Sequence, residues 1–347
     1  MRDEELTGLC RELIRRPSVS GEERAVAEFL RDTMASLGYP QVEIDRHGSV
    51  LGWIPGCRPG KTVLMDGHID TVPVEDPGLW THDPFAGEVE GERLYGRGAS
   101  DMKGGVAAMV LAAARFAKDS GGDFAGTICV SCSVQEERFE GVACREIARL
   151  ARPDYVIIGE ATPTTLKIGQ RGRAEVTVET RGRSCHSSNP EKGINAVYHM
   201  AELIGELRRL PPPEHPLLGQ GILELTDIIS APYPGASVVP GLCRATFDRR
   251  LLPGETAESV LGPIRAAIAR VKERVPELET AAELTRGSSG CWTGDTLAAE
   301  RFFPAWVLPE DHQLVCAALA GLRAAGIDAP LSHYAFCTNA SSFCGEL

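Results

Sequence analysis

Four largely apolar segments each bring an acidic residue or a histidine to one end, and this pattern constrains the fold more than any other feature. In open α/β sheets, ligands bind outside the carboxyl ends of the strands. Acids and a histidine delivered to one such rim indicate a metal cluster rather than scattered surface charge. The endings are Asp66-Gly-His68-Ile-Asp70 after 61–65, Asp101 within 98–105, Gln135-Glu136-Glu137 after 127–134, and Glu160 after 155–159.

The order of the expected elements favours an α/β fold, with a mainly parallel sheet and helices on both of its faces. After a helical start, a capping box at Ser20-Gly-Glu-Glu23 is expected to begin a second helix. The alternation then continues along the chain. Strands are expected at 41–45, 50–54, 62–66, 127–134 and 154–159, and helices at 104–118 and near 141–150.

From about residue 169 the pattern changes to β-α-β-β-α-β, which is the order of a ferredoxin-like module. A helix near 310–325 and a strand at 331–337 are then expected to rejoin the first domain. We therefore expect a catalytic metal-binding domain made of 1–168 and 286–347, with 169–285 inserted into it as a separate α+β domain.

Composition excludes several classes of protein. The formal net charge of -12 argues against a nucleic-acid partner, because phosphates require clustered Lys and Arg. The charged start lacks an apolar signal region and no stretch approaches membrane-spanning length, so we expect a cytoplasmic protein with no membrane partner. Many unpatterned cysteines fit that compartment, and Cys129 and Cys132, inside a predicted strand, are expected to be buried thiols.

His68 and Asp70 are the strongest pair of candidates for a metal site. The H-x-D spacing puts both side chains on one face of a strand, because strand periodicity is two. A histidine that binds metal usually donates its other ring N–H to a carboxylate, which fixes the tautomer. Alone, His68 would be read as a loop histidine, but the neighbouring acidic endings favour a ligand.

Asp101 precedes an expected helix, where a carboxylate can act simply as a cap. The following Gly104-Gly105 argue against that interpretation, because two glycines in a first turn cost helix stability. The two glycines are explained if the backbone at this point must approach another group closely. A carboxylate that bridges two metal ions about 3.5–4 Å apart would supply that reason.

Glu136 and Glu137 are adjacent at a strand end, where the chain can turn. One can then bind metal while its neighbour acts as general base on the attacking water. For this pair and for Glu160, the alternative is plain surface charge. The specificity comes from the conjunction of all the acids with His68.

These motifs together resemble the M20 metallopeptidase/aminoacylase family, which includes acetylornithine deacetylase and succinyl-diaminopimelate desuccinylase. The resemblance covers essentially the whole chain in order, and two segments of the inserted domain are most similar to the YgeY-like subgroup. The motifs of the catalytic part are 67–73, 96–105, the Glu136-Glu137 pair and Gly159-Glu160, and those of the inserted part are 231–240 and 247–255.

The resemblance implies a zinc-dependent hydrolase that cleaves an amide bond in a small N-acyl amino acid or short peptide. Family members hold two Zn²⁺ per subunit, with Co²⁺ or Mn²⁺ as alternatives. The implied roles are His68 and Glu160 on the first zinc, Asp101 as the bridge, Glu137 on the second zinc, Asp70 orienting His68, and Glu136 as general base.

The inserted domain is implied to form a homodimer and to act as a lid. His186 would reach the site of the partner subunit and polarise the scissile carbonyl, and Arg250 would hold the substrate carboxylate. Ser237 replaces an asparagine that is common in relatives, so a substrate contact from this position is expected to change. The Asp101–Met102 peptide is expected to be cis.

One departure concerns the second zinc. The family supplies it with another histidine from a segment after the final sheet strands, and 338–347 ends before that segment. We therefore expect one zinc or none, and we read His333 as a strand residue rather than a replacement ligand. The alternative function is an impaired or inactive family member that keeps the dimeric scaffold. A dinucleotide-binding enzyme is disfavoured, because Gly96-x-Gly98 lacks the further glycine.

Overall fold

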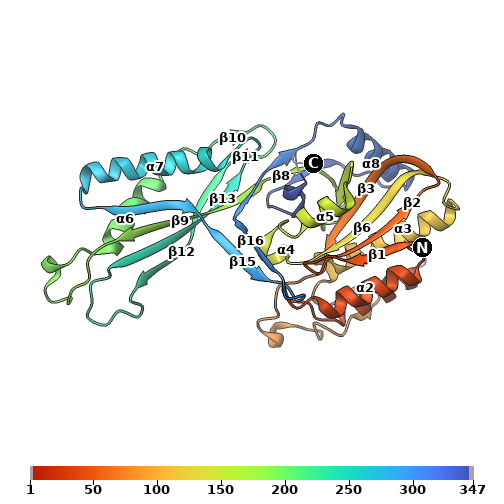
Figure 1. The fold of residues 1–347 in the computed structure, drawn as a ribbon, viewed down its shortest axis with the longest axis horizontal. Coiled ribbons are helices and arrows are strands. Elements are labelled where there is room, and N and C mark those ends of the chain that lie inside the picture. The colour runs from red at the N-terminus through yellow and green to blue at the C-terminus, as the bar shows by residue number, and fades with distance from the viewer. Residues whose placement is uncertain (1–2, 344–347) are drawn as a thin grey trace.

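One of the two lobes in Figure 1 is organised around a five-stranded sheet with the order β1-β2-β6-β3-β7. The structure is a computed structural model and describes residues 3–343. Ladders β3–β6 and β3–β7 are parallel, whereas β1–β2 and β2–β6 are antiparallel. The expected α/β class is confirmed, in a sheet of mixed direction. The strands are β1 (Gln41–Ile44), β2 (Val50–Pro55), β3 (Arg58–His68), β6 (Ala125–Ser133) and β7 (Tyr155–Ile158).

Helices cover both faces of this sheet, as expected. Successive strand residues point to opposite faces, and the buried neighbours Val50 and Leu51 accordingly pack in different hydrophobic clusters. Val50 packs with residues of α1, α2 and α3, and Leu51 packs with residues of α5. The helices of this lobe up to β7 are α1 (Asp3–Ile14), α2 (Arg24–Ser36), α3 (Gly104–Asp119), α4 (Glu136–Phe139) and α5 (Cys144–Ala151).

A smaller three-stranded sheet, with the order β18-β8-β19, completes the first lobe. The β19 strand runs parallel to β8, and β18 runs antiparallel to it. The segment after the second lobe thus pairs with β8, which precedes that lobe in the chain. The elements are β8 (Leu166–Gln170), β18 (Trp306–Val307), α8 (Gln313–Ala324) and β19 (Leu331–Tyr334).

The second lobe contains an antiparallel sheet with the order β12-β13-β9-β14 and two helices that share one core with it. Its main elements follow the expected β-α-β-β-α-β order, with a short β10–β11 hairpin added before β12. They are β9 (Gly172–Arg181), α6 (Ala196–Leu207), β10 (Glu214–His215), β11 (Gly219–Gln220), β12 (Ile222–Ala231), β13 (Leu242–Leu251), α7 (Ala257–Arg274) and β14 (Glu279–Leu284).

A β-hairpin leads from the second lobe back to the first (Figure 1). It consists of β15 (Arg286–Gly290) and β16 (Thr296–Glu300), and it follows directly after β14. The next strand, β17 (Phe302–Phe303), pairs with the beginning of β9. The hairpin is therefore connected at its base to the sheet of the second lobe.

The remaining elements are short. They are strands β4 (Glu88–Glu90) and β5 (Arg93–Tyr95), a π-helical turn (Ala99–Lys103), and 3-10 turns at Pro77–Leu79, Pro190–Lys192 and Asn339–Ser342. Among residues 3–343, none of the helices combines the length and the apolar character needed to cross a bilayer.

Candidate metal centre

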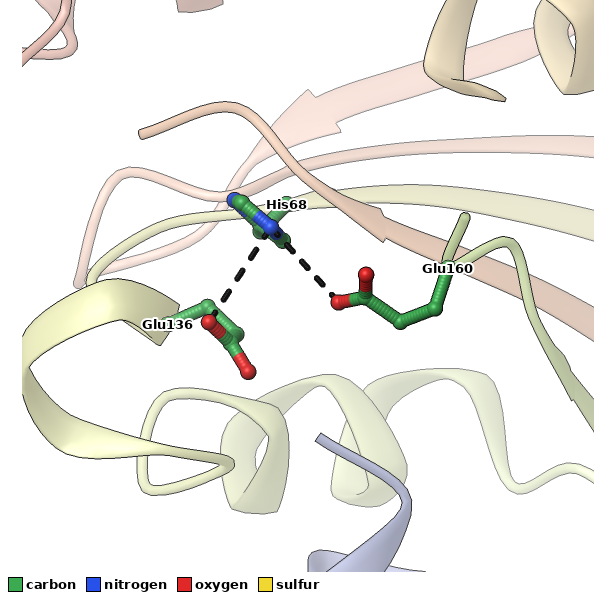
Figure 2. Close-up of side chains that lie close together, drawn as sticks. All are labelled: His68, Glu136 and Glu160. Atoms are coloured by element: carbon green, nitrogen blue, oxygen red, sulfur yellow. Dashed lines mark ion pairs between the residues drawn. The ribbon is translucent and has the colours of Figure 1, made fainter. Parts of the chain in front are cut away.

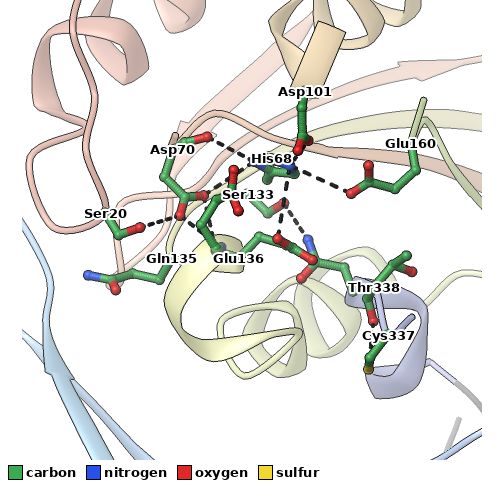
Figure 3. A network of polar contacts seen from close by, with 12 residues as sticks. Ser20, His68, Asp70, Asp101, Ser133, Gln135, Glu136, Glu160, Cys337 and Thr338 are labelled. Carbon is green, nitrogen blue, oxygen red and sulfur yellow. Dashed lines mark hydrogen bonds and ion pairs between the residues drawn. The ribbon is translucent and has the colours of Figure 1, made fainter. Parts of the chain in front are cut away.

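His68 ends strand β3, which lies between the parallel strands β6 and β7. Its side chain is 1% exposed, and its Nε2 lies 2.9 Å from Asp101 Oδ1, 3.6 Å from Glu160 Oε1 and 4.0 Å from Glu136 Oε2. Figure 2 shows the last two carboxylates pointing toward the imidazole, and Figure 3 adds Asp101. The strand ends therefore converge as the sequence predicts, because parallel strands end at the same rim.

Asp101 reaches this rim from an irregular turn before α3, and its peptide bond to Met102 is cis, as expected. The two glycines after it allow close packing. A Cβ on Gly105 would lie 2.6 Å from the carbonyl oxygen of Gly159, and one on Gly104 would lie 2.6 Å from that of Ala99. The start of α3 can therefore approach the segment that carries Glu160.

Two overlapping groups of side chains have donor atoms within 4.8 Å of one another. One consists of His68, Glu136 and Glu160, and the other of His68, Asp101 and Glu137. Tetrahedral zinc with bonds of about 2.0–2.2 Å places its ligand atoms about 3.3–3.6 Å apart. The distances from His68 Nε2 to the three carboxylates, 2.9, 3.6 and 4.0 Å, bracket this range, and the nitrogen and oxygen donors are those that zinc accepts.

Burial makes negative charge costly in this cluster. Burial raises the pKa of Glu136 well above its usual range, raises that of Glu160 to about 7, and also raises that of Glu137. In the described part of the chain, the ion pairs of Asp101, Glu136 and Glu160 all go to His68. A single imidazole thus faces several carboxylates, and a bound cation would compensate them.

The pKa of His68 reflects the same surroundings. Burial alone would lower it, but the hydrogen bonds to Asp101 and Asp70 and the charge of Glu136 raise it well above its ordinary value. Nδ1 lies 2.9 Å from the main-chain oxygen of Asp70 and 3.6 Å from its carboxylate. A neutral His68 that donates its Nδ1–H to this carbonyl keeps Nε2 available for a metal.

The buried carboxylate of Asp70 organises the segment that carries the acids (Figure 3). It accepts the backbone N–H of Glu136 at 3.0 Å, the N–H of Glu137 at 3.1 Å, and the Ser20 hydroxyl at 2.7 Å. The predicted capping box is therefore wrong. Helix α2 begins at Arg24, and the Ser20 side chain binds Asp70 instead of a helix N–H.

Sequence reasoning missed Gln135, which contributes to the geometry of the turn that carries Glu136. Its φ of 64° and ψ of 20° lie in the left-handed region, which costs a non-glycine residue roughly 1–2 kcal/mol. Its buried side chain accepts a hydrogen bond from Ser289 Oγ at 2.8 Å and donates one to the Gly290 carbonyl at 2.7 Å. A glutamine before two glutamates carries no local signal of these distant partners.

Sequence reasoning also missed the polar network around Asp66, which lies on β3 two residues before His68. Its fully buried carboxylate accepts hydrogen bonds from Ser131, from Ser133 Oγ at 3.3 Å, and from Asn339 Nδ2 at 3.0 Å. Asn339 Oδ1 also accepts the N–H of Gly141 at 2.8 Å. A polar residue inside an apolar run signals a need for partners, but the partners come from distant segments.

The structure does not bring the expected catalytic residue His186, or the expected substrate-binding residues Ser237 and Arg250, to the cluster. The described polar contacts of His186, Ser237 and Arg250 stay within the second lobe: His186 Nδ1 lies 2.8 Å from Ser188 Oγ, and Arg250 Nε lies 2.7 Å from Asp248 Oδ1. His333, on β19, belongs to neither ligand group in the described residues. Burial and the charges of Lys167 and Arg171 lower its pKa.

Known proteins resemble this chain in sequence and in fold. The family described as Peptidase family M20/M25/M40 matches residues 64–343. The uncharacterized protein YgeY of Escherichia coli K12 is 35% identical over 347 residues, covering 99% of this chain and 84% of that protein. The succinyl-diaminopimelate desuccinylase of Cereibacter sphaeroides ATCC 17029 is 32% identical, covering 76% of this chain and 72% of that protein.

Solved structures extend this likeness to the whole described fold. The M20 family metallo-carboxypeptidase Sso-CP2 from Sulfolobus solfataricus superposes with a TM-score of 0.75 at 18% sequence identity, covering 99% of this chain and 89% of that one. The aminopeptidase PepT from Bacillus cereus gives a TM-score of 0.74 at 17% identity, with coverages of 99% and 88%. At these identities the likeness establishes the fold.

Proposed function

The chain belongs to peptidase family M20/M25/M40, and from that premise we propose that it is a zinc-dependent hydrolase that cleaves an amide bond in a small N-acyl amino acid or short peptide. The observation that carries the proposal is the convergence of His68 with the carboxylates of Asp101, Glu136, Glu137 and Glu160. Desuccinylases among the relatives support an acyl amino acid as substrate.

His68, Glu160 and Asp101 would hold the first zinc, and Asp101 and Glu137 would serve a second position. Co²⁺ and Mn²⁺ are alternatives for the same donors. When bound, zinc supplies a coordinated water with a pKa of about 7 and polarises the substrate carbonyl. The donor set fits this ion, because it combines one imidazole nitrogen with carboxylate oxygens.

Glu136 would act as the general base. It would accept a proton from the attacking water and donate it to the nitrogen of the leaving amine. Its buried position raises its pKa, which suits a group that must hold the proton between these two transfers. Asp70 would fix the location of Glu136 through the backbone N–H that it accepts.

The alternative of an impaired or inactive family member has no support in the comparisons, and several of the relatives are named as desuccinylases. We also propose a cytoplasmic location. Cys129 and Cys132 are fully buried and free, and the other described cysteines are free as well, which fits a reducing compartment.

Arg250 would recognise the free carboxylate of the substrate. Its guanidinium is paired with Asp248 but remains 31% exposed. A charge-assisted hydrogen bond contributes about 1.5–3 kcal/mol, so Arg250→Ala should raise KM for a free-carboxylate substrate about tenfold to hundredfold. Assays of the metal-loaded enzyme with a panel of N-acyl amino acids and their methyl esters measure this change. KM for the esters should change little.

Arg244→Ala provides the matched control for this substitution. Arg244 lies on the same strand β13 and is likewise paired with a carboxylate, that of Glu179 at 3.0 Å. Arg244→Ala should leave KM unchanged for both the acid and the ester. Equal losses for acid and ester in Arg250→Ala would contradict the assignment, and failure of the unmodified protein to hydrolyse any member of the panel would contradict the proposed function.

We further propose a catalytic domain of residues 1–168 and 286–347, and a homodimer that forms through the inserted domain of residues 169–285. In the described sheet of the second lobe, β12 is an edge strand and exposes Ile228 and Ile229, which favours pairing with another chain. Pairing of this kind would carry His186 to the site of the partner subunit, where it would polarise the scissile carbonyl. Ser237, nearby in sequence to this edge, would line the same substrate position.

Mixing two inactive variants tests this dimer. His186→Ala and Glu136→Gln should each be nearly inactive, but exchange of subunits should restore about a quarter of wild-type turnover, because random pairing makes half of the dimers mixed, with one intact site each. Sedimentation velocity should show a dimer throughout. A monomer with full activity, or a mixture without recovery, would show that His186 does not serve a partner.

A further inference from the structure

Gln135, the residue before Glu136, is held by contacts that the chemistry itself does not require. Its side chain is fully buried, and both of its amide atoms bind β15, through the Ser289 hydroxyl at 2.8 Å and the Gly290 carbonyl at 2.7 Å. Its backbone is left-handed, with φ of 64°. A non-glycine residue keeps that conformation only where its surroundings select it, and here the hairpin provides two of the selecting contacts.

The hairpin of β15 and β16 is itself fixed at both of its ends. At its base, Thr285 N–H donates to the Glu175 carbonyl at 2.8 Å, on strand β9 of the second lobe. At its tip, Trp292 Nε1 donates to the Gly48 carbonyl at 3.3 Å, and Thr293 Oγ1 donates to the Arg46 carbonyl at 2.7 Å, both in the first lobe. The hairpin is therefore a strut between the lobes, and Gln135 binds it at the last two residues of β15, next to the tip.

The segment that carries Glu136 is thus held from two sides. On one side, Asp70 accepts the N–H groups of Glu136 and Glu137. On the other side, Gln135 binds Ser289 and Gly290 of the strut. Asp70 fixes the backbone after the turn, whereas the strut fixes the left-handed residue at which the chain turns away from β6.

We propose that Gln135 is a positioning residue for Glu136, and that the β15–β16 hairpin sets the location of the general base through Ser289 and Gly290. The inference rests on the proposed function, because it takes Glu136 as the base. A displacement of about 1 Å at a reacting group can cost on the order of 100-fold in rate. Loss of a hydrogen bond between Gln135 and the hairpin should therefore lower kcat without weakening metal or substrate binding.

The first test compares two hydroxyl deletions on the same hairpin. Ser289→Ala removes an anchor of Gln135, whereas Ser288→Ala removes an exposed hydroxyl from the neighbouring position of the same strand. Ser289→Ala should lower kcat about tenfold or more, with KM and zinc content unchanged, and Ser288→Ala should keep kcat. In a Glu136→Gln background, Ser289→Ala should lower the residual turnover no further. Unchanged kcat in Ser289→Ala, or equal loss in Ser288→Ala, would overturn the proposal.

A second test does not depend on turnover. Amide hydrogen exchange of Glu136 and Glu137 reports how firmly their N–H groups are held against Asp70. Exchange at these amides should be about tenfold faster in Ser289→Ala but not in Ser288→Ala, at matched global stability. Unchanged exchange would overturn the inference even in an active enzyme. Faster exchange in a protein that hydrolyses nothing would support the strut and refute only the proposed function.

Discussion

Glu136→Gln is expected to lower turnover by a factor of about 10²–10⁴ while the protein keeps its metal. The substitution preserves the size of the side chain and its backbone bond to Asp70, and it removes only the ability to accept a proton. Steady-state hydrolysis of a free-carboxylate N-acyl amino acid, with zinc content measured on the same sample, checks both parts of the expectation.

The zinc measurement also separates two roles for Glu136. Its Oε2 lies 4.0 Å from His68 Nε2, and it forms a ligand group with His68 and Glu160, so Glu136 could instead bind the metal. Lower zinc content in Glu136→Gln would favour the ligand role. The adjacent Glu137→Gln serves as the comparison, because a proposed ligand should lose metal. Normal turnover with Glu136→Gln would mean that Glu137, or a base from outside this cluster, accepts the proton instead.

The convergence of the acids on His68 could be predicted because it depends on a general property of sheets. Strands β3, β6 and β7 are parallel, so the residues that follow them must meet at one rim. The sequence pattern also identified α3 and the glycines at its start, since Gly104 and Gly105 do approach neighbouring backbone closely. Each of these predictions needed only local periodicity and chain direction.

The contacts that stabilise the rim could not be predicted, because their partners are distant in the sequence. The local rule assigned the Ser20 hydroxyl to a helix cap. In the structure this hydroxyl instead donates to the buried carboxylate of Asp70, which is 50 residues away in the sequence. Asn339 reaches Asp66 across 273 positions, and Ser289 reaches Gln135 across 154. Nothing in the residues around Ser20, Gln135 or Asp66 specifies which distant segment will lie beside them.

His68→Ala is expected to abolish both metal binding and activity. His68 is the one nitrogen donor in both ligand groups of the described residues, and the ion pairs of Asp101, Glu136 and Glu160 all go to it. Loss of a residue that only orients a ligand costs about 10–100-fold in metal affinity, so loss of the ligand itself should cost at least about 100-fold. Equilibrium dialysis against zinc measures this directly.

A stability readout makes the same test independent of turnover. A ligand that binds only the folded state stabilises it by about 2.7 kcal/mol at 100 times its Kd. Zinc should therefore raise the unfolding midpoint of the unmodified protein and leave that of His68→Ala unchanged. His47→Ala is the control, because His47 is also buried in the first lobe and lies 3.1 Å from a carboxylate, that of Asp295. Its midpoint should still rise with zinc, even if it starts lower. An equal zinc response in all three proteins would place the metal elsewhere and remove the basis for assigning catalysis to this rim.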